Sequence, residues 1–248
     1  MNKRWLAILE LLNKEETLDV NKLSEMLNVS AVTVRKDLDA LEKQGLLSRR
    51  HGQAMRVSPN DIGYRMIFDY DVKKKIAARA GKMVEYGETV MIESGSTCAM
   101  LAAEIAGNRR CSTIITNSAF ISNHVRAIPG ARVILLGGLC DPDAQVMTGP
   151  LVRKCAEEFN VDKFFIGTDG YYPEEGFFNN DMLRVEAVRA MAAQAAKCII
   201  ITTCEKFNRR GLVQLMPAHE VSFVITDALP ENCKSSLEKN GVEIIIAE

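Results

Sequence analysis

The stretch NVSAVTVRKDLDALEKQGLLSRRHGQA, residues 28–54, decides how the first part of this chain folds. A short turn leads into a segment with helical spacing, which stops at Gly45. Ser30 stands at the expected N-cap of this helix, where its hydroxyl can accept a hydrogen bond from a free backbone N–H. A short hairpin follows, and three residues that can contact phosphate lie at its predicted tip: Arg49, Arg50 and His51. The stretch therefore predicts a helix followed by a wing.

The predicted helix has one apolar face and one polar face. Three apolar residues recur at the i, i+4 and i+7 spacing of a buried stripe, namely Val34, Leu38 and Leu41. Val32 and Lys36 point away from that stripe, and Thr33 and Arg35 flank it. The N-terminal end of such a helix can enter the major groove of DNA, where Arg and Lys suit guanine and the Val and Thr methyl groups suit thymine. For this segment alone, an ordinary amphipathic helix with a solvated charged face is the alternative.

The neighbouring sequence favours DNA binding. Helical spacing extends over residues 3–13 and again over residues 18–27, with Asp19 as the expected N-cap of the second segment. Residues 46–47 and 55–57 are typical of the two strands of a hairpin. Between residues 30 and 56, six basic side chains stand against three acidic ones, a local charge of +3, whereas the whole chain has a formal charge of −1. Positive charge is concentrated where phosphate contact requires it.

Residues 3–57 resemble the winged helix-turn-helix of the DeoR family of bacterial sugar-metabolism repressors. The resemblance rests on the run LSEMLNVSAVTVRKDLDALEKQGLLSRRHGQA, within which VS-x-x-T-V-R-K-D-L is the specific core. The family usually closes the wing with His-Gly-Gly, whereas this chain has His51-Gly52-Gln53. The resemblance implies that residues 1–57 bind double-stranded operator DNA through Ser30, Val32, Thr33, Arg35, Lys36, Arg49, Arg50 and His51.

Length and composition fit two globular domains. At 248 residues the chain is longer than one typical domain, and its 47% hydrophobic and 25% charged residues are ordinary for a soluble protein. No apolar run is long enough to cross a membrane, and the charged residues that follow WLAIL argue against a signal peptide. The seven cysteines are scattered and never form C-x-x-C, so we expect no disulfide framework, no structural zinc and no cofactor. A reducing cytoplasm is the expected location.

Residues 58–72 are predicted to link the two domains. Ser58-Pro59-Asn60-Asp61 is typical of a turn, and the residues that follow match neither the helical nor the strand periodicity. Over residues 73–248, β-branched runs alternate with helical segments. Strands are expected at 89–93, 112–116, 131–136, 163–167, 198–202, 221–226 and 242–247, and helices at 98–106, 119–127, 150–159, 182–196 and 231–240. This alternation predicts an α/β domain whose mostly parallel sheet is covered on both faces.

The carboxyl ends of these strands are rich in glycine and hydroxyl residues, and α/β proteins bind ligands at that edge of the sheet. The first strand runs into Ser94-Gly95-Ser96-Thr97 at the start of a helix, which predicts a phosphate site made of backbone N–H groups, hydroxyls and the positive helix end. The lysine of a Walker loop and the G-x-G-x-x-G of a dinucleotide site are missing, so a small phosphorylated molecule fits better than ATP or NAD. A Ser/Thr-capped helix without a ligand is the alternative. The other strand ends contribute Asn117, Gly137, Gly138, Asp169 and Lys206.

The second half also resembles the DeoR family, in its effector domain. The matching runs are ESGSTCAMLA, TNS, VILLGG, FFIGTDG, VRAM and EKF. The resemblance implies the fold of ribose-5-phosphate isomerase and related CoA-transferase enzymes, and a phosphorylated sugar held by residues 94–97 with Asp169 and Lys206 near the sugar. Family members commonly have Asp where this chain has Glu93, and Asp-x-Ser-Lys where it has Cys204-Glu205-Lys206. Arg184 also departs from the usual acidic, Thr-rich segment.

Two classes of function compete. The first is a transcriptional regulator, a repressor of a carbohydrate-utilisation operon, that a phosphorylated sugar gates. The second is an active sugar-phosphate isomerase or deaminase joined to a DNA-binding domain, for which Asp169, Glu186 and Lys206 would supply acid–base chemistry. These groups also hydrogen-bond sugar hydroxyls, and nothing marks a nucleophile with its base, so we expect a regulator and count Glu186 among the effector-binding residues. A domain that dimerises without binding phosphate is a third alternative. Because one helix and its wing read a short half-site, a homodimer or homotetramer is expected.

Overall fold

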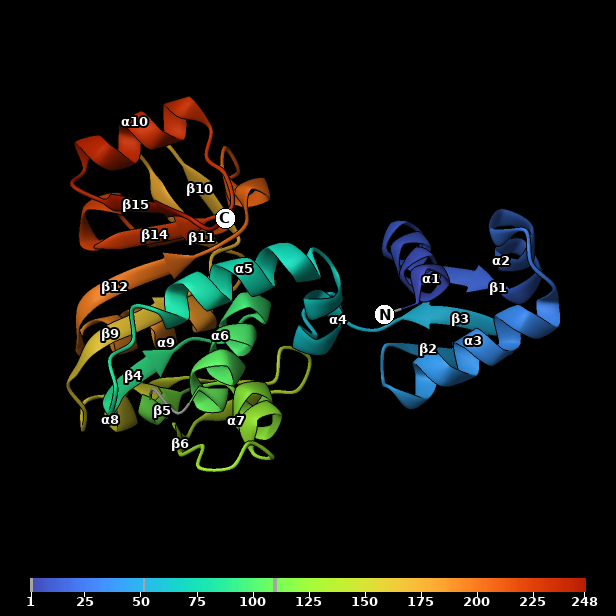
Figure 1. The fold of residues 1–248 in the computed structure, drawn as a ribbon, viewed down its shortest axis with the longest axis horizontal. Coiled ribbons are helices and arrows are strands. Elements are labelled where there is room, and N and C mark those ends of the chain that lie inside the picture. The colour runs from blue at the N-terminus through green and yellow to red at the C-terminus, as the bar shows by residue number, and fades with distance from the viewer. Residues whose placement is uncertain (1, 51, 109–110) are drawn as a thin grey trace. The chain divides into compact units, whose positions relative to one another are not determined.

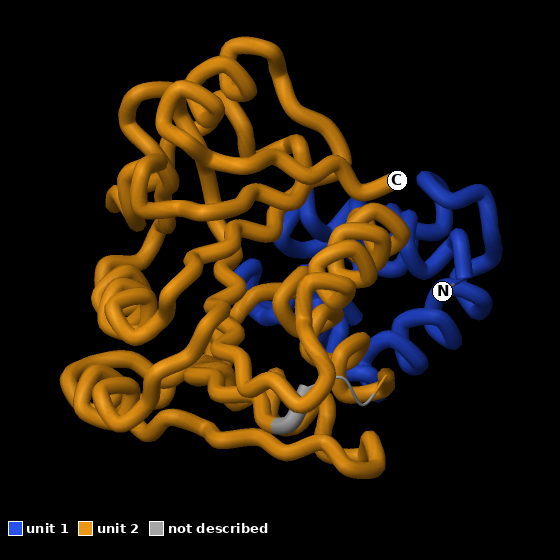
Figure 2. Tube along the Cα trace, turned by 60° about the vertical axis from the view of Figure 1, so that its left-hand side comes forward, with its two compact units in different colours: residues 1–68 blue, residues 69–248 orange. Residues whose placement is uncertain are grey.

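The computed structural model describes residues 2–50, 52–108 and 111–248, and it divides into two compact units. Unit 1 comprises residues 1–68 and unit 2 comprises residues 69–248 (Figures 1 and 2). Each unit buries an apolar cluster of its own. A domain has a hydrophobic core of its own, so each of the two units has the character of a domain.

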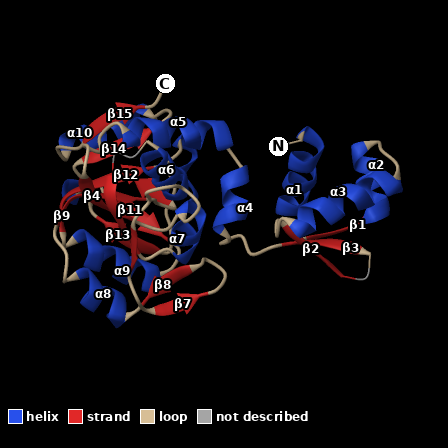
Figure 3. Cartoon of the chain, turned by 60° about the horizontal axis from the view of Figure 1, so that its bottom comes forward, coloured by secondary structure: helices blue, strands red, loops and turns tan. Residues whose placement is uncertain are grey.

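Unit 1 packs helices on an antiparallel sheet, which has three strands within the described residues (Figure 3). Its elements are α1 (Lys3–Lys14), β1 (Thr17–Asp19), α2 (Val20–Leu27), α3 (Ala31–Lys43), β2 (Leu47–Arg50), β3 (Gln53–Arg56) and α4 (Ile62–Ile67). The strand order is β1-β3-β2. Strands β2 and β3 form the predicted hairpin, and β1 is a third strand that the sequence pattern did not indicate.

Local chemistry sets the turn between α2 and α3. Asn28 ends α2 in the left-handed conformation, with φ 52°, which asparagine adopts more readily than most residues. Ser30 then caps α3 by accepting a hydrogen bond from the backbone N–H of Thr33 at 3.2 Å, and the Asp19 side chain caps α2. Both predicted N-caps are confirmed. The predicted apolar stripe of α3 is also confirmed, because its three residues are fully buried.

The boundary between the units differs from the predicted linker, residues 58–72. Helix α4 lies in the middle of that segment and packs on the core of unit 1. Tyr64 of α4 is 2% exposed and donates its hydroxyl to the carbonyl oxygen of Leu9 at 3.1 Å, and the ring of Phe68 meets that of Tyr64 edge-on at 5.1 Å. The packing of these two aromatic rings therefore extends unit 1 beyond the predicted turn at Pro59. Unit 2 begins at Asp69.

Unit 2 is built on a parallel sheet, which has seven strands in the part of the chain that is described. The strands are β4 (Glu88–Ile92), β5 (Cys111–Thr116), β6 (Val133–Leu135), β9 (Val161–Ile166), β12 (Ala195–Ile201), β14 (Phe223–Thr226) and β15 (Glu243–Ile246). Their order is β15-β14-β12-β9-β4-β5-β6, and all neighbouring pairs are parallel. Each strand overlaps one of the predicted β-branched runs, so the predicted α/β fold class is confirmed.

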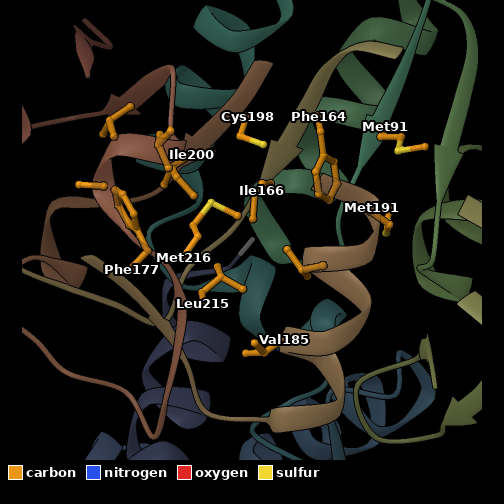
Figure 4. Close-up of a cluster of buried hydrophobic side chains, with 14 of the residues drawn as sticks. Met91, Phe164, Ile166, Phe177, Val185, Met191, Cys198, Ile200, Leu215 and Met216 are labelled. Carbon is orange, nitrogen blue, oxygen red and sulfur yellow. The ribbon is translucent and has the colours of Figure 1, made fainter. Parts of the chain in front are cut away.

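Helices cover both faces of this sheet, as Figures 1 and 3 show. They are α5 (Tyr70–Gly81), α6 (Ser96–Gly107), α7 (Ala119–Val125), α8 (Pro150–Ala156), α9 (Met182–Ala192) and α10 (Glu231–Lys239), with the 3-10 turns η1 (Cys204–Lys206) and η2 (Ala218–Glu220). Figure 4 shows the core on one face, where Val185 and Met191 of α9 lie with Phe164 and Ile166 of β9. Phe165, between the latter two, points to the opposite face and is equally buried. Burial on both faces is why these strands are continuous apolar runs.

Two small antiparallel sheets complete unit 2. One pairs β7 (Leu139–Asp141) with β8 (Val146–Thr148), and the other has the order β10 (Gly170–Tyr172), β11 (Gly176–Asn179) and β13 (Val213–Met216). These five strands were not predicted, because three or four residues give too few alternations to be recognised. Gly170 shows how tightly the second sheet packs, since a methyl group there would lie 2.5 Å from the carbonyl oxygen of Arg209.

Candidate functional site

The first turns of α3 present side chains to solvent. Val32 is 59% exposed, and Arg35 and Lys36 are exposed as well. Thr33 is half-buried, and its hydroxyl oxygen lies 2.9 Å from that of Ser30. The residues that the sequence assigns to base contact therefore lie on the outward side of α3, opposite its buried stripe, with Ser30 fixing where the helix begins.

The wing holds its two arginines differently. Arg50 is exposed, whereas Arg49 is half-buried and forms an ion pair with Asp39 of α3 through Nη1. The backbone N–H of Arg49 donates to the carboxylate of Glu42 at 2.8 Å, which fastens the wing to α3. The Nε atom of Arg49 is inaccessible to solvent and has no hydrogen-bond partner among the described residues. His51, the third predicted contact of the wing, lies outside the described residues.

A buried carboxylate ties α3 to α1. Asp37 is 6% exposed and accepts hydrogen bonds from Nε and Nη2 of Arg4 and, at 2.9 Å, from the indole Nε1 of Trp5. The hydrogen bonds from Arg4 hold the pKa of Asp37 below its ordinary value. Sequence reasoning missed this group. The sequence feature that could have revealed it is the position of Asp37, three residues after Val34 on the buried side of an amphipathic helix.

In unit 2 the strand register brings three groups of predicted effector residues to one edge of the sheet. Ile92 pairs with Thr116 on one side and with Phe165 on the other, so the segments after β4, β5 and β9 leave the sheet next to one another. Neighbouring strands lie about 4.8 Å apart. Residues 94–97 follow β4, Asn117 follows β5, and Asp169 lies just beyond β9. These three groups therefore share one edge.

Residues 94–97 form the loop at the N-terminus of α6, with Gly95 as its N-cap. All four residues are buried. The first backbone N–H groups of a helix have no partner within the helix, and the helix dipole is positive at this end. A twelve-residue helix that begins with Ser and Thr thus offers an oxyanion several donors at once.

Glu93, directly before this loop, pairs with Arg184 of α9. Nη2 of Arg184 donates to Oε1 of Glu93 at 3.1 Å, and the two side chains are 8% and 2% exposed. The hydroxyl of Ser94 donates to the same oxygen at 3.1 Å, and the N–H of Gly167 donates to Oε2 at 3.3 Å. Burial raises the pKa of Glu93 against the opposing charge of Arg184. Neither residue was a predicted member of the site, although both depart from the pattern of the family that the sequence resembles.

The side-chain amide of Asn117 is hydrogen-bonded through its nitrogen but not through its oxygen within the described residues. Asn117 is 1% exposed, and its Nδ2 atom donates to the carbonyl oxygen of Met147 at 3.1 Å. This bond fixes the orientation of the amide, because only the nitrogen can donate. Its Oδ1 atom is buried and has no hydrogen-bond partner among the described residues. An acceptor without a donor is therefore available at the end of β5.

Three further predicted residues each have a different partner. Asp169 accepts a hydrogen bond from the backbone N–H of Asn180 at 3.1 Å. Lys206 pairs with its neighbour Glu205 at 2.8 Å, and the exposed Glu186 pairs with Arg153 of α8 at 3.2 Å. The structure thus places Glu186 on the outer side of α9.

The two predicted glycines after β6 differ from each other. A methyl group on Gly138 would lie 2.6 Å from the carbonyl oxygen of Thr148 and 2.9 Å from Val152, so close packing requires glycine there. Gly137 is exposed, and a methyl group on it would meet Cys155 only at 3.9 Å. Gly138 therefore has a packing reason for being glycine, whereas Gly137 does not.

Over residues 2–50, 52–108 and 111–248, no three His, Cys, Asp or Glu side chains gather as they would around a metal ion. The same residues contain no helix whose length and apolar character would let it span a bilayer.

The first unit has a solvent-facing helix beside a wing, and the second is an α/β unit with its own core and a buried helix N-terminus at its strand ends. This combination defines a class: DNA-binding regulators that carry a ligand-sensing domain. The chain belongs to the DeoR family. Residues 4–60 match the DeoR-like helix-turn-helix domain, and residues 69–228 match the DeoR C-terminal sensor domain. The family membership that the sequence indicated is confirmed.

The chain is similar to several named regulators over nearly its whole length. The HTH-type transcriptional regulator GolR of Listeria innocua is 27% identical over 99% of this chain and 98% of its own. The HTH-type transcriptional repressor CsqR of Escherichia coli is 26% identical over 100% of this chain and 96% of its own. Among solved structures, ribose 5-phosphate isomerase A from Methanocaldococcus jannaschii aligns with 56% of this chain and 55% of its own, at 17% identity and a TM-score of 0.42.

Proposed function

We propose that this protein is a DNA-binding transcriptional repressor of a carbohydrate-utilisation operon, and that a phosphorylated sugar controls its binding to DNA. The proposal is carried by one observation: one unit has an exposed helix beside a wing, and the other has a buried helix N-terminus at the start of α6, whose first backbone N–H groups have no partner within the helix. Membership of the DeoR family and the names of the relatives support it. A regulator of chromosomal DNA acts in the cytoplasm, where we place this chain.

In unit 1, the N-terminal end of α3 enters the major groove of operator DNA. Thr33, Arg35 and Lys36 contact base edges, and Val32 meets a thymine methyl group. Three residues of the wing bind phosphates beside the groove, namely Arg49, Arg50 and His51. Two copies of α3 in a homodimer or homotetramer then read two half-sites.

In unit 2, residues 94–97 bind the phosphate of the effector, and neighbouring strand ends bind its sugar. The buried Oδ1 atom of Asn117 supports a ligand with hydroxyl groups, because a hydroxyl would supply the donor that this acceptor lacks in the protein. Asp169 and Lys206 bind further hydroxyls. Gly137, Gly138 and Glu186 stay predicted members of the site.

We infer regulation rather than turnover. Two of the three side chains that acid–base chemistry would use are in ion pairs, Glu186 with Arg153 and Lys206 with Glu205. The relatives with which the chain shares nearly its full length are named as regulators. A unit that only dimerises is less well supported, since dimerisation alone would not require the buried polar atoms that have no partner among the described residues, Oδ1 of Asn117 and Nε of Arg184.

The test uses the purified full-length protein. Selection from a random DNA pool yields its operator, and phosphorylated sugars with their unphosphorylated counterparts are then tested for an effect on operator affinity. We expect one phosphorylated sugar to change operator affinity by a coupling of about 1–3 kcal/mol, and operator DNA to change the affinity for that sugar phosphate by the same factor. The unphosphorylated sugar should bind far more weakly, because charge-assisted bonds to phosphate are strong. Equal affinity for both forms would contradict the proposed effector, and turnover without an effect on DNA would contradict regulation.

A further inference from the structure

Arg184 carries a positive charge into unit 2 and does not use all of its donors there. It lies in the first turn of α9, where the Asp181 carboxylate caps the helix by accepting from the backbone N–H of Arg184 at 2.9 Å. Nη2 donates to Glu93 at 3.1 Å and lies 3.5 Å from both the carbonyl and the hydroxyl oxygen of Ser94. The guanidinium therefore lies against the first residue of the 94–97 loop.

The Nε atom of Arg184 is inaccessible to solvent and has no hydrogen-bond partner among the described residues. A buried donor without an acceptor costs free energy, and more so on a charged group, so native proteins pair nearly all such donors. In a guanidinium, Nε–H and one N–H of Nη2 point the same way. This edge binds an oxyanion through two parallel hydrogen bonds, and here half of it lacks an acceptor.

Glu93 is not free to fill that edge. Its Oε2 atom accepts from the N–H of Gly167, and its Oε1 atom is shared between Ser94 and Arg184. The carboxylate is also confined between two glycines, because a methyl group on Gly95 or Gly167 would come within 3.4 or 3.2 Å of Oε2. Held in this way, Glu93 offsets the charge of Arg184 and positions it, but leaves Nε–H to another acceptor.

We propose that Arg184 is a direct ligand of the anionic group of the effector. The anion lies at the N-terminus of α6, with the backbone N–H groups of the 94–97 loop on one side and the Nε–H group of Arg184 on the other. A phosphate monoester suits these two sets of donors better than a carboxylate, because it offers three free oxygens rather than two. The inference rests on the proposed function, to whose effector site it adds one residue and one fixed charge.

The charges around the site support this role. Burial acts to lower the pKa of Arg184, but the carboxylates of Glu93, Asp169 and Asp181 raise it. Without Arg184, these carboxylates would repel a phosphate dianion. Lys206, the cation that the sequence predicted for this site, already pairs with Glu205. Arg184 thus brings a positive charge to this strand edge, where it offsets part of the charge of the carboxylates.

Inorganic phosphate is the probe, because it tests the anion site without knowledge of the sugar. Thermal unfolding of the full-length protein is followed by far-UV circular dichroism over a phosphate titration, with chloride at equal ionic strength as the reference. R184K keeps a charge opposite Glu93 but lacks the Nε–H group that Arg184 leaves to the anion. E93Q/R184M removes both members of the pair, so that no buried charge is left alone. We expect R184K to bind phosphate about tenfold more weakly or worse, and E93Q/R184M to show only the general stabilisation that phosphate gives any protein.

Glu88 and Lys163 provide a matched control in two strands of the same sheet. They form an ion pair of 2.7 Å, with side chains 8% and 13% exposed, and Glu88 begins β4 at the end opposite to Glu93. Like E93Q/R184M, E88Q/K163M removes one carboxylate and one cation, but at a distance from the 94–97 loop. It should respond to phosphate as the wild type does.

The role of Arg184 is overturned if R184K and E93Q/R184M gain as much from phosphate as the wild type, or if the wild type shows only the response of E93Q/R184M. Phosphorylated sugars separate this result from the proposed function. If a sugar phosphate shifts operator affinity equally in the wild type and both variants, the proposed function holds and the role of Arg184 falls. If phosphate binds through Arg184 but no sugar phosphate shifts operator affinity, the role of Arg184 holds and the effector class falls.

Discussion

Unit 1 and unit 2 each bury a carboxylate against an arginine, and the two pairs are built differently. In unit 1, Asp37 accepts from Nε and Nη2 of Arg4 together and also from Trp5. In unit 2, Glu93 accepts from Nη2 of Arg184 alone, and Nε has no partner among the described residues. The Arg4 side chain is 34% exposed, whereas that of Arg184 is 8% exposed.

This difference separates a pair that holds helices together from a pair that is suited to a ligand. Asp37 fills the whole edge of its arginine, and the hydrogen bonds from Arg4 lower its pKa. Glu93 fills half of that edge, and burial raises its pKa although Arg184 opposes the effect. Complete pairing leaves nothing for a second anion. Incomplete pairing at a strand end leaves a positioned donor for one.

Replacing Arg184 alone should have the largest effect on stability, because it leaves Glu93 buried without its cation. We expect R184M to lower the free energy of unfolding of unit 2 by about 3–5 kcal/mol at neutral pH, and E93Q/R184M to recover most of it. Urea unfolding followed by far-UV circular dichroism measures the loss, while the fluorescence of Trp5, the chain's single tryptophan, reports on unit 1. An equal loss in E93Q/R184M would mean that Arg184 acts through packing, and the contrast with Asp37 would disappear.

The loss in R184M should also depend on pH. Because the folded-state pKa of Glu93 is raised above its ordinary value of 4.5, its ionisation costs stability as the pH rises past that value. Without Arg184 this pKa rises further. The stability of R184M should therefore recover as the pH is lowered from about 8 to about 5, because a protonated Glu93 needs no cation. A loss that stays constant over that range would contradict the charge argument.

Asp37 should show a smaller effect in a different pH range. We expect D37N to destabilise unit 1 by about 1–3 kcal/mol, the usual value for hydrogen bonds to a charged group, as measured by Trp5 fluorescence in urea. Since the pKa of Asp37 is lowered from 3.8, its stabilisation is fully present above that value and is lost as the pH falls through the lower folded-state pKa. The difference between D37N and the wild type should therefore stay constant from about pH 8 to 5. A difference that closes above pH 5 would show that Asp37 behaves like Glu93.

The parallel sheet could be predicted because each central strand is buried on both faces. Phe164, Phe165 and Ile166 are all fully buried, which is why the strand is a continuous apolar run. The sheet of β10, β11 and β13 could not, because its strands are short and β13 lies more than thirty residues beyond β11. Helix α4 was missed for a related reason: Tyr64 packs on α1, fifty-five residues away at Leu9.

Positions at the strand ends could be predicted, but their partners could not. Parallel register alone places residues 94–97 beside Asn117 and Gly167. The pairing of Glu93 with Arg184 joins residues ninety-one positions apart, and in the sequence Arg184 looks like any arginine of an amphipathic helix. Likewise, the contact that requires glycine at Gly138 is with Thr148, in a strand that the sequence pattern did not indicate.

Arg35 and Lys36 of α3 differ from Arg4 and Arg184, because their charges are exposed to solvent when no DNA is bound. We expect R35A and K36A each to weaken operator binding by about 1–3 kcal/mol and to relax specificity at the contacted base pairs. The stability of unit 1 should change by less than about 0.5 kcal/mol, because both side chains are exposed. Binding to the operator and to its single-base variants measures the effect. Lys43, exposed at the other end of α3, is the matched control. If R35A and K36A bind the operator as K43A does, α3 does not read bases through these residues.

Arg49 lies between the exposed and the buried cations, and its effect should be the smallest. It pairs with Asp39, with side chains 25% and 56% exposed, and its Nε atom has no partner among the described residues. We expect R49A to weaken binding to all DNA sequences alike and to reduce the salt slope by about one. D39N should do the opposite, because it frees Arg49 for phosphate. An exposed pair is worth only about 0–1 kcal/mol, so binding should tighten by no more than about fivefold.

Salt titrations with the operator and with a random duplex measure both variants. D39N/R49A should bind as R49A does, because Asp39 acts on DNA only through Arg49. If D39N binds as the wild type does while R49A loses one unit of salt slope, Asp39 does not compete with phosphate. If R49A instead changes which sequences are preferred, Arg49 contacts a base edge. In that case the Nε atom of Arg49, which has no partner among the described residues, would not indicate a phosphate contact in unit 1, although we link the corresponding atom of Arg184 to an effector anion in unit 2.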